Sequence, residues 1–175
     1  MDKKQFILLM LVPAIVILTL MGVKLFTLSF GKEILLEVEP IDPRDLFRGD
    51  YVTLSYKISR IDLNNIPFDT NFSLGETIYA ALSKKEKFWT IDSVSHTKPD
   101  LTENQVCIKG RVTSSYNNKL SVEWGIESYF VPEGEGRLIE RQREGGNVSV
   151  IVSVDSTCSS VLKELLINDE PLKIE

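Results

Sequence analysis

The stretch from Phe6 to Val23 contains no charged side chain, and Leu, Ile, Val and Met dominate it. Lys24 follows, and residues 25–30 are again mostly apolar. A membrane-spanning helix needs about 20 apolar residues. Residues 6–30 supply that length if the Lys24 amine reaches the headgroups, and Pro13 is tolerable in such a helix. We therefore predict a membrane anchor that contacts lipid through residues 6–30.

Two other interpretations of this stretch remain open. The apolar region of a cleaved signal peptide spans about 7–15 residues and ends at a small-residue cleavage site. Here the run is longer, and Thr27-Leu28-Ser29 is a poor match to such a site. A buried helix of a soluble protein rarely has so long an uncharged run. An uncleaved anchor is favoured.

Flanking charges predict the orientation of the anchor. Lys3 and Lys4 precede the apolar run and favour a cytoplasmic N-terminus, although Lys24 and Lys32 on the other side weaken that signal. We expect residues 1–30 to cross the cytoplasmic membrane once and residues 31–175 to form a domain outside it.

Charge and composition exclude several classes of site. Leaving out Lys3, Lys4, Lys24 and Asp2 reduces the totals of 20 basic and 25 acidic residues to 17 and 24, a net charge of −7 for residues 31–175. Such a domain is a poor nucleic-acid binder and gains nothing from an anionic lipid surface. One histidine and two cysteines argue against a zinc site, which needs about four ligands. We expect no metal and no cofactor.

Beyond the anchor, short runs of β-forming residues recur with Pro, Gly, Asn and Asp between them. Residues 50–58 alternate in polarity, with Val52, Leu54, Tyr56 and Ile58 on the apolar face. Strands are predicted over 34–38, 50–58, 77–82, 88–94, 106–112, 119–124, 128–131 and 148–154. Helices are expected over 161–167 and within 132–143. The pattern predicts a mainly β domain, an antiparallel sandwich or barrel of roughly eight to ten strands with one or two short helices.

Residues 40–56 combine two prolines, two arginines and three aspartates before a strand. A rigid turn whose carboxylates cap backbone amides is the favoured interpretation. A binding edge is the functional alternative. A calcium site from Asp42, Asp45 and Asp50 is not favoured, because calcium takes six to eight oxygens and the spacing is not that of an EF-hand.

Residues 49–56 read Gly-Asp-Tyr-Val-Thr-Leu-Ser-Tyr, which fills every defined position of the signature of the bacterial GDYXXLXY family. Residues 108–112 and 125–136 are also similar to that family, and the resemblance covers nearly the whole chain. It implies a membrane-anchored protein of a group often encoded beside multi-pass membrane proteins. The resemblance indicates little about a reaction or a ligand.

A weaker resemblance links the chain to type I signal peptidases, which also place a β-rich domain after a membrane helix. Arg48-Gly49-Asp50 and the later Lys109-Gly110-Arg111 are similar to their strands. A Ser/Lys dyad needs a serine within reach of a buried lysine. Residues 41–46, where that serine would lie, contain none. The resemblance therefore implies distant fold kinship without the dyad. As an alternative, Lys109 would act with Ser55 or Ser114, but a solvent-facing strand lysine is favoured.

A second dense segment, residues 124–136, carries aromatic and acidic side chains before a Pro- and Gly-containing loop. Core packing is favoured there, and an aromatic, acidic docking surface is the alternative. The candidate binding residues of the chain are Arg48, Gly49, Asp50, Tyr51, Leu54, Tyr56, Lys109, Arg111, Glu127, Tyr129, Phe130 and Glu133.

The remaining reactive residues give weaker signals. Cys107 and Cys158 would be able to pair in an oxidising space, but two separate, unremarkable thiols are favoured, since sequence does not reveal their proximity. His96 is expected on the surface without a partner.

The absence of a complete catalytic pattern favours a non-enzymatic role. We expect a single-pass envelope protein whose β domain binds or scaffolds another membrane or envelope component, with a membrane protein as its partner. A signal-peptidase-like hydrolase and a ligand-binding or sensory module are the alternatives. The latter would require a concave pocket lined by aromatic residues.

Overall fold

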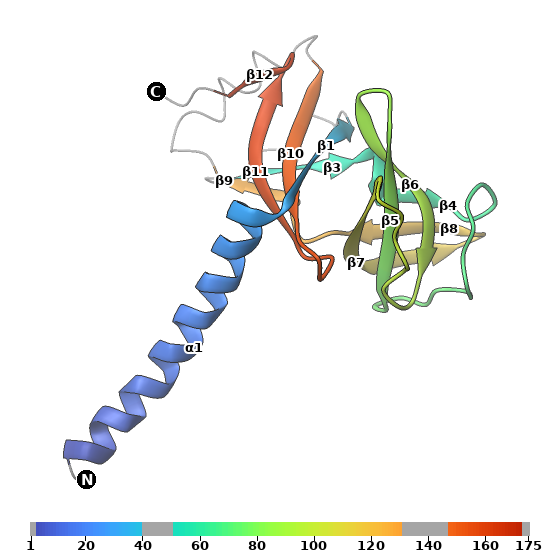
Figure 1. The fold of residues 1–175 in the computed structure, drawn as a ribbon. Coiled ribbons are helices and arrows are strands. Elements are labelled where there is room, and N and C mark those ends of the chain that lie inside the picture. The colour runs from blue at the N-terminus through green and yellow to red at the C-terminus, as the bar shows by residue number, and fades with distance from the viewer. Residues whose placement is uncertain (1–2, 40–50, 131–146, 173–175) are drawn as a thin grey trace.

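The computed structural model describes residues 3–39, 51–130 and 147–172, without the side chains of residues 3–8, Tyr51, Val52 and Phe130. Within these residues, one long helix leads into a β domain of two five-stranded antiparallel sheets and a two-stranded ribbon (Figure 1). The elements are α1 (Lys3–Phe30), β1 (Lys32–Glu39), β2 (Tyr51–Thr53), β3 (Ser55–Tyr56), η2 (Lys57–Ser59), β4 (Arg60–Asp62), β5 (Thr77–Lys85), β6 (Phe88–Ser95), β7 (Gln105–Tyr116), β8 (Lys119–Glu123), β9 (Ser128–Phe130), β10 (Val148–Val154), β11 (Ser160–Ile167) and β12 (Glu170–Pro171). The predicted mainly β fold behind an N-terminal apolar helix is confirmed.

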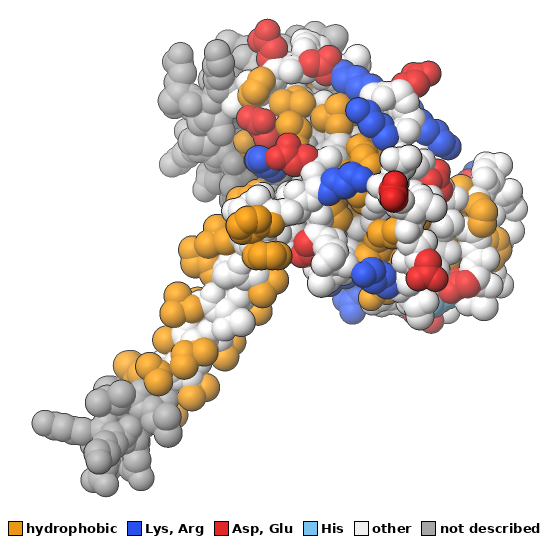
Figure 2. Space-filling model, in the orientation of Figure 1, with side chains coloured by type: hydrophobic (Ala, Val, Ile, Leu, Met, Phe, Trp, Pro, Cys, Tyr) orange, Lys and Arg blue, Asp and Glu red, His pale blue; other side chains and the backbone are white. Residues whose placement is uncertain are grey.

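Helix α1 projects from the β domain as an apolar rod (Figure 2). Its segment Leu9–Phe30 has 22 residues and a mean hydropathy of 2.4. At a rise of about 1.5 Å per residue this is about 33 Å long, close to the roughly 30 Å of a bilayer core. The described part of the chain therefore contains one helix that is long and apolar enough to cross a membrane.

The first sheet has the order β12-β11-β10-β1-β3. Strand β1 pairs antiparallel with β10, from Lys32 opposite Val154 to Glu37 opposite Ser149. Alternation along β1 buries Ile34 and Leu36 in the core. Because β1 begins two residues after α1 ends, the helix leads directly into an interior strand of this sheet, between β10 and β3.

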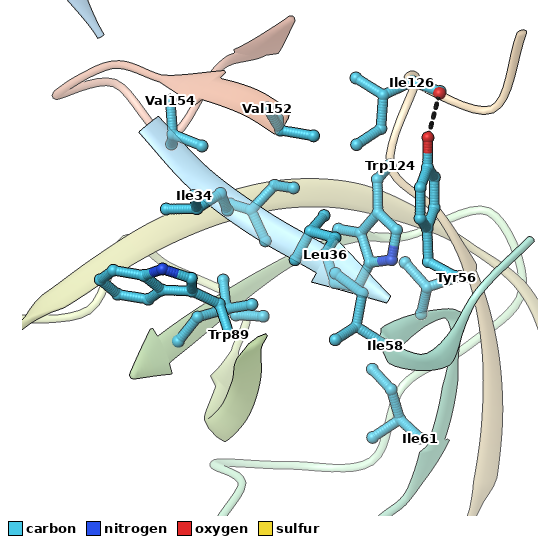
Figure 3. Packing of buried hydrophobic residues seen from close by; sticks show 14 of the residues in the cluster. Ile34, Leu36, Tyr56, Ile58, Ile61, Trp89, Trp124, Ile126, Val152 and Val154 are labelled. Atoms are coloured by element: carbon cyan, nitrogen blue, oxygen red, sulfur yellow. Dashed lines mark hydrogen bonds between the residues drawn. The ribbon is translucent and has the colours of Figure 1, made fainter. Parts of the chain in front are cut away.

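The second sheet has the order β4-β8-β7-β5-β6 and curls on itself. The segment after β4 returns to β6, where the Val94 N–H donates to the Pro67 carbonyl at 3.1 Å and Phe68 forms a parallel bridge with Val94. The two sheets pack around one apolar core. Figure 3 shows Ile34 and Leu36 of β1 among core side chains that include Trp89 of β6 and Trp124 after β8.

The predicted helix over residues 161–167 is wrong, because this segment forms strand β11. Its core-facing positions explain the error. Leu162 pairs with Val152, Leu165 pairs with Val150, and the unpaired Lys163 is a β-bulge. The bulge changes the spacing of inward side chains from two residues to three at this point. That spacing resembles the period of a helix in the sequence alone.

The single strand predicted over 50–58 is also wrong. The segment is divided into β2, which pairs with β9, and β3, which pairs with β1, and it ends in the short η2 helix. The predicted burial pattern does hold for the described side chains: Leu54, Tyr56 and Ile58 are buried. The helix predicted within 132–143 lies outside the described residues.

Candidate functional site

The second half of the signature octapeptide lies inside the domain. Leu54 is buried, and its N–H donates to the Glu127 carbonyl at 2.7 Å. Tyr56 is fully buried, and its hydroxyl donates to the Ile126 carbonyl at 2.5 Å (Figure 3). Burial raises the pKa of the Tyr56 phenol far above its usual range, and the Glu127 carboxylate adds to that rise. Tyr56 is therefore a neutral hydrogen-bond donor at physiological pH.

Glu127 shapes the loop that receives these bonds. Its carboxylate accepts hydrogen bonds from the backbone N–H of Trp124 at 2.5 Å and of Gly125 at 2.9 Å. Gly125 has a φ of +77°, a backbone region that favours glycine. The resulting bend directs the Ile126 carbonyl at Tyr56. Glu127, predicted as a binding residue, thus holds the loop in place with its carboxylate.

The two dense sequence segments are structural partners. In the β2–β9 ribbon, Tyr51 pairs with Phe130, Val52 with Tyr129 and Thr53 with Ser128. Tyr129 is half-buried against the core. Burial raises the pKa of its phenol, and the Glu164 carboxylate adds to that rise. Leu54, Tyr56, Glu127 and Tyr129 are therefore brought together by the fold. Arg48, Gly49, Asp50 and Glu133 lie outside the described residues, as do the side chains of Tyr51 and Phe130.

Removal of the Tyr56 hydroxyl tests this assignment. We expect Tyr56→Phe to lower the free energy of unfolding by about 1–3 kcal/mol, because the Ile126 carbonyl loses its buried donor. Denaturant unfolding of the full-length protein in detergent measures the change. Tyr116→Phe is the matched control, since that ring is 75% exposed at the β7–β8 turn. Equal unfolding midpoints for the two variants would contradict the assignment.

Lys109 and Arg111 lie on strand β7, and both are exposed. The Lys109 N–H donates to the Cys158 carbonyl at 2.9 Å, and the Arg111 guanidinium donates to the Gly75 carbonyl at 3.3 Å. Ser114 lies five positions further along the same strand, and Ser55 belongs to the other sheet. Within the described residues, no hydrogen bond joins the Lys109 amine to a serine.

Cys107 and Cys158 form a disulfide, with their Cα atoms 4.8 Å apart. The expectation of two separate thiols is wrong. The bond joins β7 of the second sheet to the β10–β11 turn of the first. Sequence did not reveal it because the two cysteines are 51 residues apart. Only the packing of the two sheets brings them together.

The same β10–β11 turn holds the end of α1, which sequence reasoning missed. Thr27 is buried, and its hydroxyl donates to the Asp155 carboxylate at 2.6 Å. In return, the Ser153 hydroxyl donates to the Thr27 carbonyl at 2.7 Å. Partial burial raises the pKa of Asp155, but hydrogen bonds from Thr157 and Thr27 outweigh it and lower that pKa. The helix is thus fastened to the domain through polar contacts.

Gly31 makes this junction compact. A Cβ at this position would lie 2.5 Å from the Thr27 carbonyl and would also collide with the Ser153 hydroxyl. The Gly31 N–H donates to the Thr27 carbonyl at 2.9 Å. The helix therefore turns into β1 without a linker. The end of α1 thus contacts β10 through Ser153, and the disulfide joins the following turn to β7.

His96, expected to be a lone surface residue, is half-exposed and has two acidic partners. Its Nδ1 lies 2.9 Å from Asp69 and its Nε2 lies 3.4 Å from Glu76. The imidazole stacks on Phe72 with ring centroids 4.1 Å apart. Among the described residues, no cluster of three His, Cys, Asp or Glu side chains has a geometry that would hold a metal ion. The arrangement ties β6 to the loop before β5.

The pairing predicts how His96 titrates. The hydrogen bond to Asp69 raises the histidine pKa, and Glu76 adds to the rise. Protonated His96 therefore stabilises the fold fully below pH 6.5, and the contribution is lost as pH rises through the elevated folded-state pKa. We expect the NMR titration of the single histidine to have its midpoint above 6.5 and to move down in Asp69→Asn. An identical midpoint in the variant would show that the Asp69 carboxylate does not stabilise the protonated imidazole.

Comparison with known proteins adds a family. The GDYXXLXY protein family model matches residues 13–165, from within α1 to near the end of β11. No curated protein and no solved structure gives a significant match. The matched region contains the signature, its partner loop, the disulfide and the helix junction. Because it covers most of the sequence, this chain belongs to the GDYXXLXY family.

Proposed function

We propose that this protein is a single-pass membrane protein whose β domain, outside the cytoplasmic membrane, binds or scaffolds another membrane or envelope component. The observation that carries the proposal is the junction between α1 and the domain. An apolar helix with exposed sides is fastened to the first sheet through Thr27, Asp155 and Ser153. A junction without a linker restricts the distance and orientation of the domain relative to a bilayer. Such a restricted position suits a domain that binds a partner at the membrane surface.

Two observations support the orientation. Lys3 and Lys4 precede the apolar segment, which favours retention of the N-terminus in the cytoplasm. The Cys107–Cys158 disulfide supports a domain in an oxidising compartment, because such bonds are rare in the cytosol. Both agree with residues 1–30 as the anchor and residues 31–175 outside.

Binding is a better-supported role than catalysis. Among the described residues, the buried serine and threonine side chains are Thr27, Ser149, Ser153 and Ser160, and Thr27 and Ser153 belong to the helix junction. The hydrolase alternative would need a buried Lys109 beside a serine, whereas Lys109 is exposed on β7. No observation favours that alternative. The ligand-binding alternative has some support from two hollows described below.

In-cell crosslinking of the tagged full-length protein, followed by purification in mild detergent, tests the proposal. We expect a stoichiometric membrane or envelope partner with the wild type. An Asp50→Ala, Tyr51→Ala variant is expected to lose the partner if the first half of the signature contributes to the contact.

The matched control is Asp100→Ala, Tyr116→Ala, which removes the same kinds of side chain from exposed positions elsewhere in the domain. Formation of the disulfide in each variant verifies folding. Absence of any stoichiometric partner with wild-type protein would count against a binding or scaffolding role and would move attention to a small ligand.

A further inference from the structure

Two hollows lie next to each other where the first sheet meets β6. The larger has a volume of about 370 Å³, and Leu35, Ile151 and Leu166 contribute apolar surface to it. The smaller has a volume of about 250 Å³ and is lined by apolar side chains of η2, β4 and β6 that include Ile58 and Ile61. Trp89 lines both hollows. They are therefore adjoining hollows that share Trp89 in their lining.

The charge around the larger hollow differs from that of the domain. Residues 31–175 carry a net charge of −7, yet the β5–β6 hairpin places Lys84, Lys85 and Lys87 close together, and Lys84 and Lys87 line this hollow. Lys32 lies over the Trp89 ring, 5.2 Å from its centroid. Figure 2 shows basic side chains gathered near the hairpin tip beside an apolar area of the first sheet.

Most of the nearby acidic groups already have partners. Lys87 is paired with Asp169, and Glu33 accepts a hydrogen bond from Lys163 at 2.5 Å. Among the described residues, Lys84 and Lys85 have no carboxylate within salt-bridge distance. Lys84 in the lining of the larger hollow and Lys32 over Trp89 are therefore the basic groups offered to an incoming molecule.

We propose that these hollows bind an extended, acidic segment of a partner polypeptide, with its apolar side chains in the two hollows that Trp89 lines and its carboxylates at Lys84 and Lys32. This inference rests on the proposed binding function and names the chemistry of the partner. Charge complementarity selects an acidic segment, since opposite potentials align and accelerate docking.

The shape of the site favours a polypeptide over a lipid chain. Small-molecule pockets typically have volumes of about 300–1,000 Å³, and each hollow lies near or below the lower end of that range. Trp89 lines both hollows. Successive side chains of an extended peptide fit two small adjoining hollows, whereas one acyl chain needs a longer continuous channel.

The two tryptophans give a direct test in the full-length protein in detergent micelles. Trp89 reports on the hollows, and Trp124 is buried in the core and serves as the internal control. The probe is a short synthetic peptide with the central sequence Leu-Thr-Leu and glutamates on both sides of it. We expect saturable movement of the Trp89 indole N–H signal in an NMR titration, without movement of the Trp124 signal. A peptide with lysines in place of the glutamates should cause no shift.

Charge reversal supplies the matched variants. Lys84→Glu should weaken the peptide affinity about tenfold or more. Lys98→Glu changes the net charge equally at an exposed position outside the lining of both hollows and should leave the affinity unchanged. An unchanged Trp124 signal verifies that each variant is folded.

Three outcomes would overturn the inference: no Trp89 shift at about 1 mM peptide, an equal response to the basic peptide, or equal weakening by Lys84→Glu and Lys98→Glu. The crosslinking experiment separates this failure from failure of the proposed function. A captured partner with no response at Trp89 would retain the function and place the interface elsewhere. A missing partner would remove both.

Discussion

Loss of the Cys107–Cys158 bond should lower the free energy of unfolding by about 4 kcal/mol. The bond closes a loop with a sequence separation of 51 residues, and the entropy of closing such a loop in the unfolded chain gives this magnitude. The measurement is denaturant unfolding of full-length protein in detergent, comparing oxidised wild type with Cys107→Ala, Cys158→Ala. Both cysteines are buried, so the variant also loses a small amount of packing.

Reduced wild-type protein provides the control, because it retains both sulfur atoms and lacks only the covalent bond. It should unfold at nearly the same denaturant concentration as the double variant. If oxidised and reduced protein unfolded at the same midpoint, the bond would not constrain the chain. Recovery of only reduced protein from intact cells would further argue against the placement of the domain outside the cytoplasm.

Gly110→Ala should destabilise the second sheet by about 3 kcal/mol. A Cβ at this position would lie 2.6 Å from the Glu123 carbonyl oxygen and 2.7 Å from the Trp124 ring. The Trp124 backbone is held by the Glu127 carboxylate, and the indole is buried in the core, so neither neighbour has room to move. For a chain of this size the loss corresponds to roughly 6–12 °C in Tm. Thermal unfolding followed by circular dichroism would measure it.

Gly22→Ala is the matched control for this experiment. It adds the same methyl group to a glycine of α1 that has no atom within 4 Å of the new Cβ, and alanine favours a helix. Its Tm should equal that of wild type or exceed it. A Gly110→Ala protein with the Tm of this control would mean that β7 and the Trp124 loop are packed less closely than described.

Much of the fold could be predicted because apolar runs and the alternation of polar and apolar residues involve residues that are neighbours in the sequence. The apolar stretch that ends near Phe30 indicated α1, and alternation along residues 52–58 indicated that Leu54 and Tyr56 face the core. Both signals need only a short window of sequence. The candidate site was predictable to a lesser extent. Glu127 and Tyr129 were recognised as notable, but their pairing with the signature segment was not visible.

The remaining features depend on contacts between distant residues. A bulge at Lys163, which exists only opposite β10, gave β11 the apparent spacing of a helix. The signature segment divides because its first part pairs with β9 and its second part pairs with β1.

The sequence by itself determined an apolar helix, a β domain with a defined buried face, and membership of a family. The tertiary structure alone decided the Cys107–Cys158 bond, the Thr27–Asp155 contact and the hollows beside Trp89. The reason is physical: secondary structure follows from residues a few positions apart, whereas these contacts join residues brought together only when two sheets and a helix pack. Side-chain chemistry limits which contacts are possible, and topology selects those that form.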